Sequence, residues 1–563
     1  MPPNTDGVDW QSIKDFRPGI QQIVSPDHPP GTAQEDGTYR CFATSAGSLM
    51  SLPRRTTSYT RTPIVSVGTV VSEEFRTIGL HIPGPAYNSS DPVPGVEQNN
   101  DNVMVATEYW TAGNQHFEVA RYTRNEGTAE WHSLWSATEA GTYSALVRPK
   151  HADFRDQRSN NTDPNQAGPS ITAWVLNGHA YMFPDDTATT VDGTRYLPGD
   201  KVNDAGGGGL ISPHDLEAHQ GRLVIFPLAT TGYGANQVYT HNECFFWTEV
   251  NDARNMDQYL AGNYLNVLAG YENPSGYGVI QSLSANELLL IKCRGGGLIL
   301  RGDLEAFEAV TLPFLRSTGL SMNRGANSPI GFVYPVDGGG IWVWNGGSTS
   351  QELSPSMNPD FWRPDPVAPT YGAQSDTGWG HGYTQCAQWN QWVVIPNNWL
   401  FDTDTGAMWR LEDPDDIVYH RAAVNWRGRS CYVSPSGWLN DDDPVFYEYQ
   451  LAEGASTWTW QSQPMSSTYE RYTEVREVAV VAQGSGTVRV TVRSGENPSG
   501  SVAVFPVDEE TRAVVIRQPV ACKGSHITFQ IESEAPSDTL EAPTVHELRW
   551  ALRDGSKLGR GIS

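Results

Sequence analysis

Short apolar or alternating runs, separated by turn residues, make up most of the chain between about residues 63 and 463. Helical spacing of apolar residues at i, i+3, i+4 and i+7 rarely lasts for more than two turns there, so strands are predicted rather than helices. The clearest runs lie at 103–110, 116–122, 171–183, 222–228, 237–242, 287–304, 330–347, 391–411 and 444–451. This pattern predicts an all-β region built from many short strands.

Several neighbouring runs are expected to pair as hairpins, because Gly-rich or Asn-Gly turns between them supply the positive φ that tight strand reversals need. Such turns lie at Asn177-Gly178, at Gly295 to Gly297 and at Gly338 to Gly340. Each of them separates two apolar runs, which is the arrangement expected of adjacent antiparallel strands.

The turns also recur at a loose period. The intervals from Gly178 to Gly221 and from Gly296 to Gly339 are 43 residues each, and that from Asn390 to Gly428 is 38. A four-stranded propeller blade has roughly 40 to 50 residues. Residues 61–465 are therefore predicted to form a β-propeller-like array of four-stranded blades, and a weakly repetitive stack of sandwiches is the alternative.

The two ends of the chain have different textures. From residue 466 onward, strict alternation at turn spacings of 12 to 20 residues predicts a C-terminal antiparallel β-sandwich over 466–563. Residues 1–60 are irregular and rich in Pro and Gly, with one apparent strand at 38–44. We expect this segment to be an N-terminal strap or arm that packs on something else.

Composition agrees with many strands and turns, since the 563 residues include 55 Gly, 38 Pro and 19 Trp but only 18% charged residues. The formal net charge is −26, which argues against a surface that grips phosphate backbones, because such binding depends on clustered Lys and Arg. Nucleic acid could pass such a protein without being held by it. General solubility is the simpler explanation of the charge.

The cysteines are scattered and show neither Cys-x-x-Cys spacing nor a His-rich partner pattern, so free and mostly buried thiols are expected. They are Cys41, Cys244, Cys293, Cys386, Cys431 and Cys522. The sequence has no basic segment followed by an apolar run at its start and no stretch of 18 apolar residues. We therefore expect synthesis in the cytosol and no membrane insertion.

Three stretches together resemble the propeller-containing tail proteins of tailed bacteriophages, especially the nozzle or tubular proteins at the tip of short tails. The most specific is 286–357, which is similar to adjacent blades in which a Gly-Asp ends one hairpin and a Gly-Gly-rich aromatic hairpin precedes a Leu-Ser segment. Residues 212–250 resemble another blade, and the succession from FDTDTGAMWRL through STWTWQSQPM resembles the closing of the propeller. The segment 37–55 also resembles a strap of such proteins.

This resemblance implies a structural virion protein without enzymatic activity, located in the virion tail and assembled in the host cytoplasm. It implies a homo-oligomeric ring, commonly of six copies, that contacts other tail or head-to-tail adaptor proteins. Genomic DNA would leave through the lumen of this ring without specific binding. An acidic lumen wall would repel phosphates and keep the DNA from sticking.

An enzyme on the same scaffold is the second hypothesis, in the form of a receptor-binding or glycan-degrading tail protein. DTDTGAMW at 402–409 partly fits the Asp-box of sialidase blades, which is blade-turn structure rather than a catalytic motif. Glycoside hydrolysis needs two carboxylates about 5 to 10 Å apart, and Asp360, Asp402, Asp404 and the run Asp441 to Asp443 are loose candidates. Solvated turn acids are the simpler interpretation of these residues.

Other signals of chemistry are weak, and no catalytic, cofactor-binding or metal-binding residue is predicted. The motifs Gly-x-Ser-x-Gly, Gly-x-x-x-x-Gly-Lys-Ser/Thr and His-Glu-x-x-His are absent. His214 and His219 are expected in the core or a turn, and 440–444 as a solvated turn rather than a calcium loop. The aromatic stretches 378–392 and 454–461 could stack on sugars, although packing in a core or between subunits is favoured.

Overall fold

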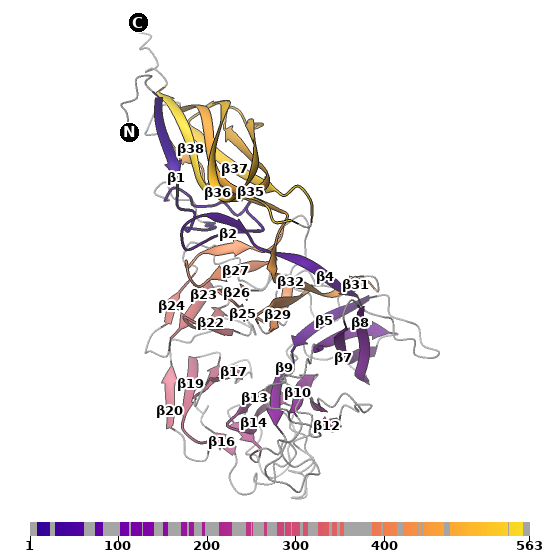
Figure 1. The fold of residues 1–563 in the computed structure, drawn as a ribbon. Coiled ribbons are helices and arrows are strands. Elements are labelled where there is room, and N and C mark those ends of the chain that lie inside the picture. Colours follow the sequence, from indigo (N-terminus) through magenta and orange to yellow (C-terminus); the bar gives the residue numbers. More distant parts are fainter. Residues whose placement is uncertain are drawn as a thin grey trace, which may run out of the picture.

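The computed structural model contains strands throughout the part of the chain that it describes (Figure 1). The described residues are 8–22, 29–60, 74–82, 102–111, 114–125, 128–139, 150–155, 170–176, 179–184, 194–196, 213–227, 244–248, 250, 264–266, 279–285, 288–293, 296–304, 308–312, 325–336, 340–345, 350–353, 385–395, 398–413, 420–426, 428–435, 439–440, 443–466, 473–538 and 540–554. Within these residues the chain is all-β, as predicted.

Seven sheets of four or five strands, counted over the described residues, form a ring of propeller blades (Figure 1). The first contains β31 (Leu439–Asn440), β5 (Glu74–His81), β6 (Asn102–Thr111), β7 (Asn114–Asn125) and β8 (Thr128–Glu139). The second contains β9 (Lys150–Arg155), β10 (Ser170–Leu176), β11 (His179–Pro184) and β12 (Thr194–Tyr196). The third contains β13 (Pro213–His219), β14 (Arg222–Pro227), β15 (Cys244–Trp247) and β16 (Tyr264–Asn266).

Three further blades follow the same consecutive antiparallel order. The fourth contains β17 (Val279–Ala285), β18 (Leu288–Cys293), β19 (Gly296–Arg301) and β20 (Glu308–Leu312). The fifth contains β21 (Ala326–Ser328), β22 (Gly331–Val336), β23 (Gly340–Trp344) and β24 (Ser350–Glu352). The sixth contains β25 (Ala387–Trp389), β26 (Trp392–Ile395), β27 (Trp399–Asp402) and β28 (Met408–Arg410).

The seventh blade combines both ends of the propeller sequence. It contains β29 (His420–Trp426), β30 (Ser430–Pro435), β32 (Pro444–Gly454) and the N-terminal strand β4 (Pro53–Thr60). β4 pairs antiparallel with β32, from Pro444 opposite Thr60 to Gly454 opposite Pro53. A strand from the start of the chain, ending at Thr60, thus completes a blade whose other strands begin at His420 and later, and this closes the ring.

Two of the three turn intervals connect equivalent positions in successive blades. In sequence order, Gly296 and Gly339 come after the second strands β18 and β22, and Asn390 and Gly428 come after the first strands β25 and β29. The interval from Gly178 to Gly221 instead joins unlike positions, because Gly178 comes between β10 and β11 and Gly221 between the first two strands of its blade. Gly178 and Gly339 themselves lie outside the described residues.

The C-terminal sheet has nine strands and lies beside one edge of the ring (Figure 1). Its strands are β1 (Val8–Ile13), β2 (Cys41–Ala43), β3 (Leu49–Ser51), β33 (Thr457–Gln461), β34 (Met465–Ser466), β35 (Thr473–Ser494), β36 (Ser501–Gly524), β37 (His526–Glu534) and β38 (Thr544–Asp554). The N-terminal segment, in which the sequence indicated one strand, therefore contributes three strands here and one to the propeller.

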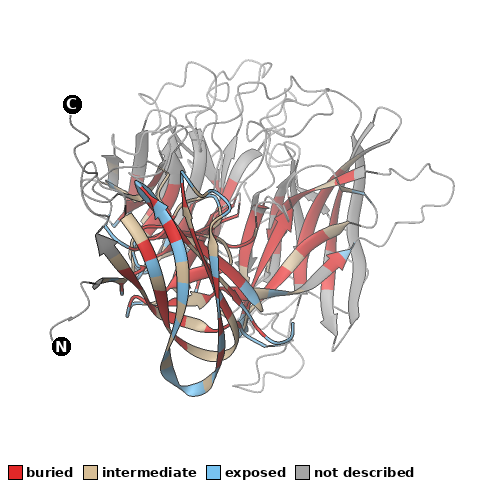
Figure 2. Cartoon of the chain, turned by 90° about the horizontal axis from the view of Figure 1, so that it is seen from above, coloured by how far each residue is buried: buried red, intermediate tan, exposed pale blue. Residues whose placement is uncertain are grey.

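The long hairpin of β35 and β36 bends across two layers of this sheet. The first half of β35 pairs with β38, and its second half pairs with β37. β36 follows the bend, so that Ser501 Oγ near its start donates a hydrogen bond to the carbonyl of Ala521 near its end (2.5 Å). Buried and exposed residues alternate along the first part of β36 (Figure 2), as expected of a sandwich with one face inside, whereas β35 has runs of consecutive buried residues at 478–480 and 490–492.

One hydrophobic cluster runs through the sandwich, the N-terminal segment and the sixth blade without interruption. Tryptophans supply much of its volume, and those in it with less than 2% exposure are Trp389, Trp399, Trp409, Trp458 and Trp460. The sandwich and the propeller therefore share a core. No helix among the described residues is long and apolar enough to cross a membrane.

Candidate functional site

The described residues between β1 and β2, 14–22 and 29–40, which we call the strap, lie between the propeller and the C-terminal sheet. On the propeller side, Ile20 N donates to the carbonyl of Met408 (2.9 Å) and Arg40 N to that of Arg410 (3.0 Å). On the other side, Tyr39 and Thr459 exchange backbone hydrogen bonds of 2.9 and 3.1 Å. The strap thus continues the hydrogen bonding of β28 and β33 at the same time.

The strap approaches the sixth blade too closely for a side chain at one position. Gly19 has a φ of +65°, and a methyl group added to it would lie 2.6 Å from Cβ of Ala407. Only glycine adopts this backbone conformation freely and leaves space for the neighbouring chain. Ala33 N then donates to the carbonyl of Gly19 (2.8 Å), so the later part of the strap lies beside the earlier part and runs parallel to it there.

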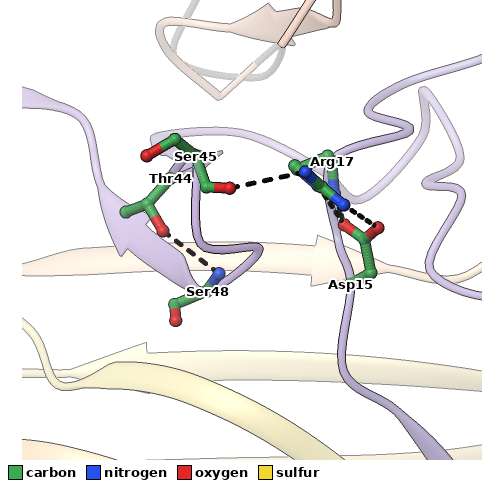
Figure 3. A network of polar contacts seen from close by, with 5 residues as sticks. All are labelled: Asp15, Arg17, Thr44, Ser45 and Ser48. Carbon is green, nitrogen blue, oxygen red and sulfur yellow. Dashed lines mark hydrogen bonds and ion pairs between the residues drawn. The ribbon is translucent and has the colours of Figure 1, made fainter. Parts of the chain in front are cut away.

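The start of the strap is anchored to the turn between β2 and β3 (Figure 3). Asp15 accepts hydrogen bonds from Arg17 Nε (2.8 Å) and Nη2 (2.7 Å), and Arg17 Nη1 reaches the carbonyl of Ser45 (3.5 Å). The side-chain hydrogen bond from Arg17 lowers the pKa of the Asp15 carboxyl. Both side chains are about half exposed, so this ion pair contributes little to stability.

A second ion pair attaches the middle of the strap to the propeller. Glu35 accepts from Arg410 at the end of β28, and the Arg410 guanidinium lies 4.9 Å from the centre of the Trp399 ring. The Arg410 side chain is only 12% exposed. The Arg410 side chain is therefore fixed by two interactions, the charge-assisted hydrogen bond to Glu35 and the cation–π contact with Trp399.

The most buried polar network of the junction surrounds Glu412, whose side chain is 4% exposed. Arg40 Nε donates to its Oε2 (2.6 Å), and Tyr449 Oη from β32 donates to its Oε1 (2.9 Å). The Glu412 backbone forms two hydrogen bonds with the Asn398 side chain, of 2.7 and 2.8 Å. Burial and then the Glu412 charge hold the pKa of Tyr449 well above its usual value, so this hydroxyl stays a donor.

A buried carboxylate also sits where β4 closes the ring. Glu448 of β32 accepts from Tyr59 Oη on β4 (3.0 Å) and from Ser430 Oγ on β30 (2.8 Å). Tyr59 stacks on Phe446, with ring centroids 4.3 Å apart. Polar and aromatic contacts therefore hold the N-terminal strand in the seventh blade.

Away from the junction, a polar cluster joins the first and second blades near their first strands. His81 Nε2 lies 2.6 Å from Asp153 Oδ1, which also accepts from Thr172 Oγ1 (2.9 Å). The His81 ring lies 4.1 Å from that of His151, and both pack near Trp174. The cluster positions a His–Asp pair between blades.

Asp402 is buried, so the expectation of a solvated turn acid is wrong for this residue. Its side chain accepts from the backbone N of Asp404 (2.9 Å) and Thr405 (3.4 Å), and burial raises its pKa. Trp409 of the same motif is fully buried. The Asp-box-like stretch therefore forms the β27–β28 turn and supports the fold.

The other candidate residues that the structure describes lie in turns or in the core. Asp443 accepts from Asn440 N (2.6 Å) in a turn, Asp404 is exposed, and His219 is buried, which lowers its pKa. Asp360, Asp441, Asp442 and the side chain of His214 lie outside the described residues. In the described ranges, no group of three or more His, Cys, Asp or Glu residues could hold a metal ion.

The predictions that the tryptophans pack in the core and that the cysteines are free and buried are confirmed for the residues that the structure describes. Trp389, Trp392, Trp458 and Trp460 are all buried, so these tryptophans pack in the core and are not available to stack on sugars. Four cysteines are free and buried, as predicted, namely Cys41, Cys386, Cys431 and Cys522. The side chains of Cys244 and Cys293 lie outside the described part.

The residues that build the junction carry no recognisable sequence signal. Arg40 and Glu412 are 372 positions apart and belong to no motif. Arg40 and Asn398 both have a positive φ. The residue type could have suggested this for Asn398, because Asn tolerates this region better than most residues, but not for Arg40.

No family model and no curated protein matches the chain. Solved structures with local similarity include the extracellular domain of a hybrid two-component system from B. thetaiotaomicron, with 11% identity over 94% of this chain and a TM-score of 0.36. The chain spans 64% of that protein's length. Others are an exo-beta-1,3-galactanase from Phanerochaete chrysosporium (9% identity, 84% of this chain and 100% of that one, TM-score 0.23) and Citrobacter koseri AztD (10%, 68% and 95%, 0.29). Because every one of these TM-scores is below 0.5, the likenesses carry no functional argument.

Proposed function

We propose that this chain is a structural subunit of the tail of a tailed bacteriophage, and that copies of it form a ring through which DNA leaves the particle. The observation that carries the proposal is the way in which the strap joins the two parts of the molecule. The strap is hydrogen-bonded to the propeller on one side and to the C-terminal sheet on the other, across one continuous core. A body so coupled resists relative motion of its parts, which suits a mechanical role.

The charge and the sequence resemblance support the same role. A net charge of −26 disfavours retention of a polyanion, and a conduit for DNA must not hold what passes through it. The blade textures at 286–357 and 212–250 resemble those of phage nozzle proteins. Six copies is the number that this resemblance implies.

Electron microscopy of the purified full chain, together with mass spectrometry of purified phage particles, tests the proposal. We expect rings with a central axis, and peptides of this chain in the particles at several copies each. A chain absent from particles would contradict the role in the virion. Single copies at the periphery of the tail would contradict the conduit.

A glycan-degrading or receptor-binding tail protein is the second candidate. One observation favours it: the neighbouring first strands β9 and β13 each carry a carboxylate, Asp153 and Glu217, beside histidines. Two carboxylates are the usual requirement for glycoside hydrolysis. Release of reducing sugar from host polysaccharide, lost in both Asp153→Asn and Glu217→Gln but kept in Asp404→Asn, would support this candidate against the first.

A further inference from the structure

His420 is buried beside the seam between the sixth and seventh blades. It begins β29, the first strand of the seventh blade, and is only 2% exposed. Two residues further on, Ala422 forms a parallel β-bridge with Gln385, and Ala423 N donates to the carbonyl of Gln385 (3.0 Å). These backbone contacts join the start of the sixth blade to the first strand of the seventh.

The His420 side chain is directed at the sixth blade. His420 lies opposite Pro435 of β30, and Ala423 lies opposite Val433, so the two side chains share one face of the sheet. Ala423 and Val433 belong to the hydrophobic cluster that includes the sixth blade. The ring of Tyr449 lies over the imidazole, with centroids 6.3 Å apart. Neither ring nitrogen of His420 has a hydrogen-bond partner among the described residues, although both are buried.

The surroundings of the ring oppose a positive charge. Burial first, and the charge of Arg55 on β4 second, lower the pKa of His420 to about 3. Among the strands that pack against β29, β25 and β26 carry no charged residue, and the titratable residues of β30 are Cys431 and Tyr432. β5 contacts the opposite face, where Ala422 belongs to a separate cluster. The imidazole is therefore neutral in the folded protein.

Tyr449 connects this histidine to the network that holds the strap. Its hydroxyl donates to Glu412 Oε1 (2.9 Å), and Glu412 Oε2 accepts from Arg40 Nε (2.6 Å). Tyr449 belongs to the seventh blade, whereas Glu412 follows the last strand of the sixth. Because Tyr449 covers the His420 ring, water reaches the ring when the two blades part, and the same movement separates Tyr449 from Glu412.

We propose that the seam between the sixth and seventh blades is an acid-sensitive latch. When the seam opens, His420 takes up a proton from solvent and Tyr449 leaves Glu412, so the strap loses its support from the seventh blade. Below about pH 6.5, where an exposed imidazole binds a proton, each further pH unit favours the open seam by up to about tenfold. The latch does not depend on whether the chain belongs to a phage tail.

Hydrogen exchange of the full chain at pH 7 and pH 5, resolved to single amides by mass spectrometry and expressed as protection factors, tests the latch. The Ala423 amide reports on the seam because it donates across it, and the Arg40 amide, which donates to Arg410, reports on the strap. We expect protection of Ala423 to be about 25-fold lower at pH 5, from the uptake of one proton by an imidazole of ordinary pKa. Protection of Arg40 should fall in the same direction.

Two substitutions separate the proton site from the link to the strap. His420→Leu removes the imidazole, so protection of Ala423 should be the same at both pH values. His526→Leu, at an exposed position, is the matched control and should behave like the wild type. Tyr449→Phe keeps a ring over His420 but loses the hydroxyl, so it should lower protection of Arg40 at both pH values and leave the pH dependence at Ala423 in place.

A 25-fold fall that persists in His420→Leu, or a wild-type chain whose Ala423 protection does not change with pH, would overturn the latch. An equal fall at the Ser462 amide, which donates to Phe529 within the sandwich, would also contradict it, because the whole molecule would then be opening. If His420→Leu does not fold, His420→Asn offers a smaller side chain that takes up no proton, and the same result is expected of it.

Discussion

Arg40 and Glu412 lie 372 positions apart in the chain, and their side chains form an ion pair with 2.6 Å between Nε and Oε2. Arg40 belongs to the strap, and Glu412 follows the last strand of the sixth blade. Tyr449 Oη of the seventh blade binds the other carboxylate oxygen. One buried carboxylate therefore connects the strap with two adjacent blades.

Removal of the Arg40 charge should destabilise the protein strongly. Arg40→Met leaves the Glu412 carboxylate buried without its cation, which costs about 3 kcal/mol or more in the free energy of unfolding. The measurement is denaturant unfolding followed by tryptophan fluorescence. Arg17→Met is the control, because the Arg17–Asp15 pair is half exposed and its loss should change the free energy of unfolding far less. Equal losses in the two variants would contradict the role given to Glu412.

Substitution of Gly19 should loosen the strap from the sixth blade. Gly19→Ala requires positive φ and places a methyl group 2.6 Å from Ala407 Cβ, so it should lower the melting temperature and speed proteolysis within the strap. Gly406→Ala has a similar φ of +73° but nothing within 4 Å of the new methyl group. This second variant should show only the backbone cost, about 1 kcal/mol. A Gly19→Ala effect no larger than that would indicate that the close approach is unimportant.

Acid should destabilise the protein through His420. Burial, and then the Arg55 charge, lower the pKa of His420 to about 3, and no hydrogen-bond partner for either ring nitrogen occurs among the described residues. The unfolded chain binds a proton near pH 6.5, so stability should decrease as the pH falls from about 6.5 towards 3. The slope approaches about 1.4 kcal/mol per pH unit.

The His420→Leu variant tests this assignment by chemical denaturation at several pH values. It should lose part of the acid dependence, whereas His526→Leu at an exposed position should keep all of it. An unchanged pH profile in His420→Leu would assign the acid sensitivity to other groups.

The thiols of Cys41 and Cys431 should resist modification in the folded protein. Both are buried, and burial raises the pKa of each above its ordinary value, so little thiolate forms. Titration with a thiol-reactive disulfide should show no reaction at these positions until denaturant is added, with peptide mapping to identify the sites. Rapid labelling of either cysteine in buffer would mean that strand β2 or the seventh blade opens readily.

Strands and hairpins could be predicted from the sequence because both depend on neighbouring residues. The alternation in β35 and the Gly-Gly-rich turn between β22 and β23 are local signals, and both predicted structures are present. For Asp402, the local pattern predicted the turn correctly but not the burial of its side chain. Its position in a turn suggested exposure, but its carboxylate is buried and accepts hydrogen bonds from the backbone N of Asp404 and Thr405, whereas Asp404 itself is exposed.

The sequence by itself therefore determined an all-β chain with propeller-like blades, a C-terminal sandwich and no recognisable catalytic motif. Only the tertiary structure decided that β4 completes the seventh blade, that Glu412 is the centre of the junction, and that the β35–β36 hairpin bends across two layers. The physical reason is the range of the interactions. Alternation and turn chemistry act over a few residues, whereas ring closure and buried ion pairs join segments hundreds of residues apart, where no local pattern specifies the partner.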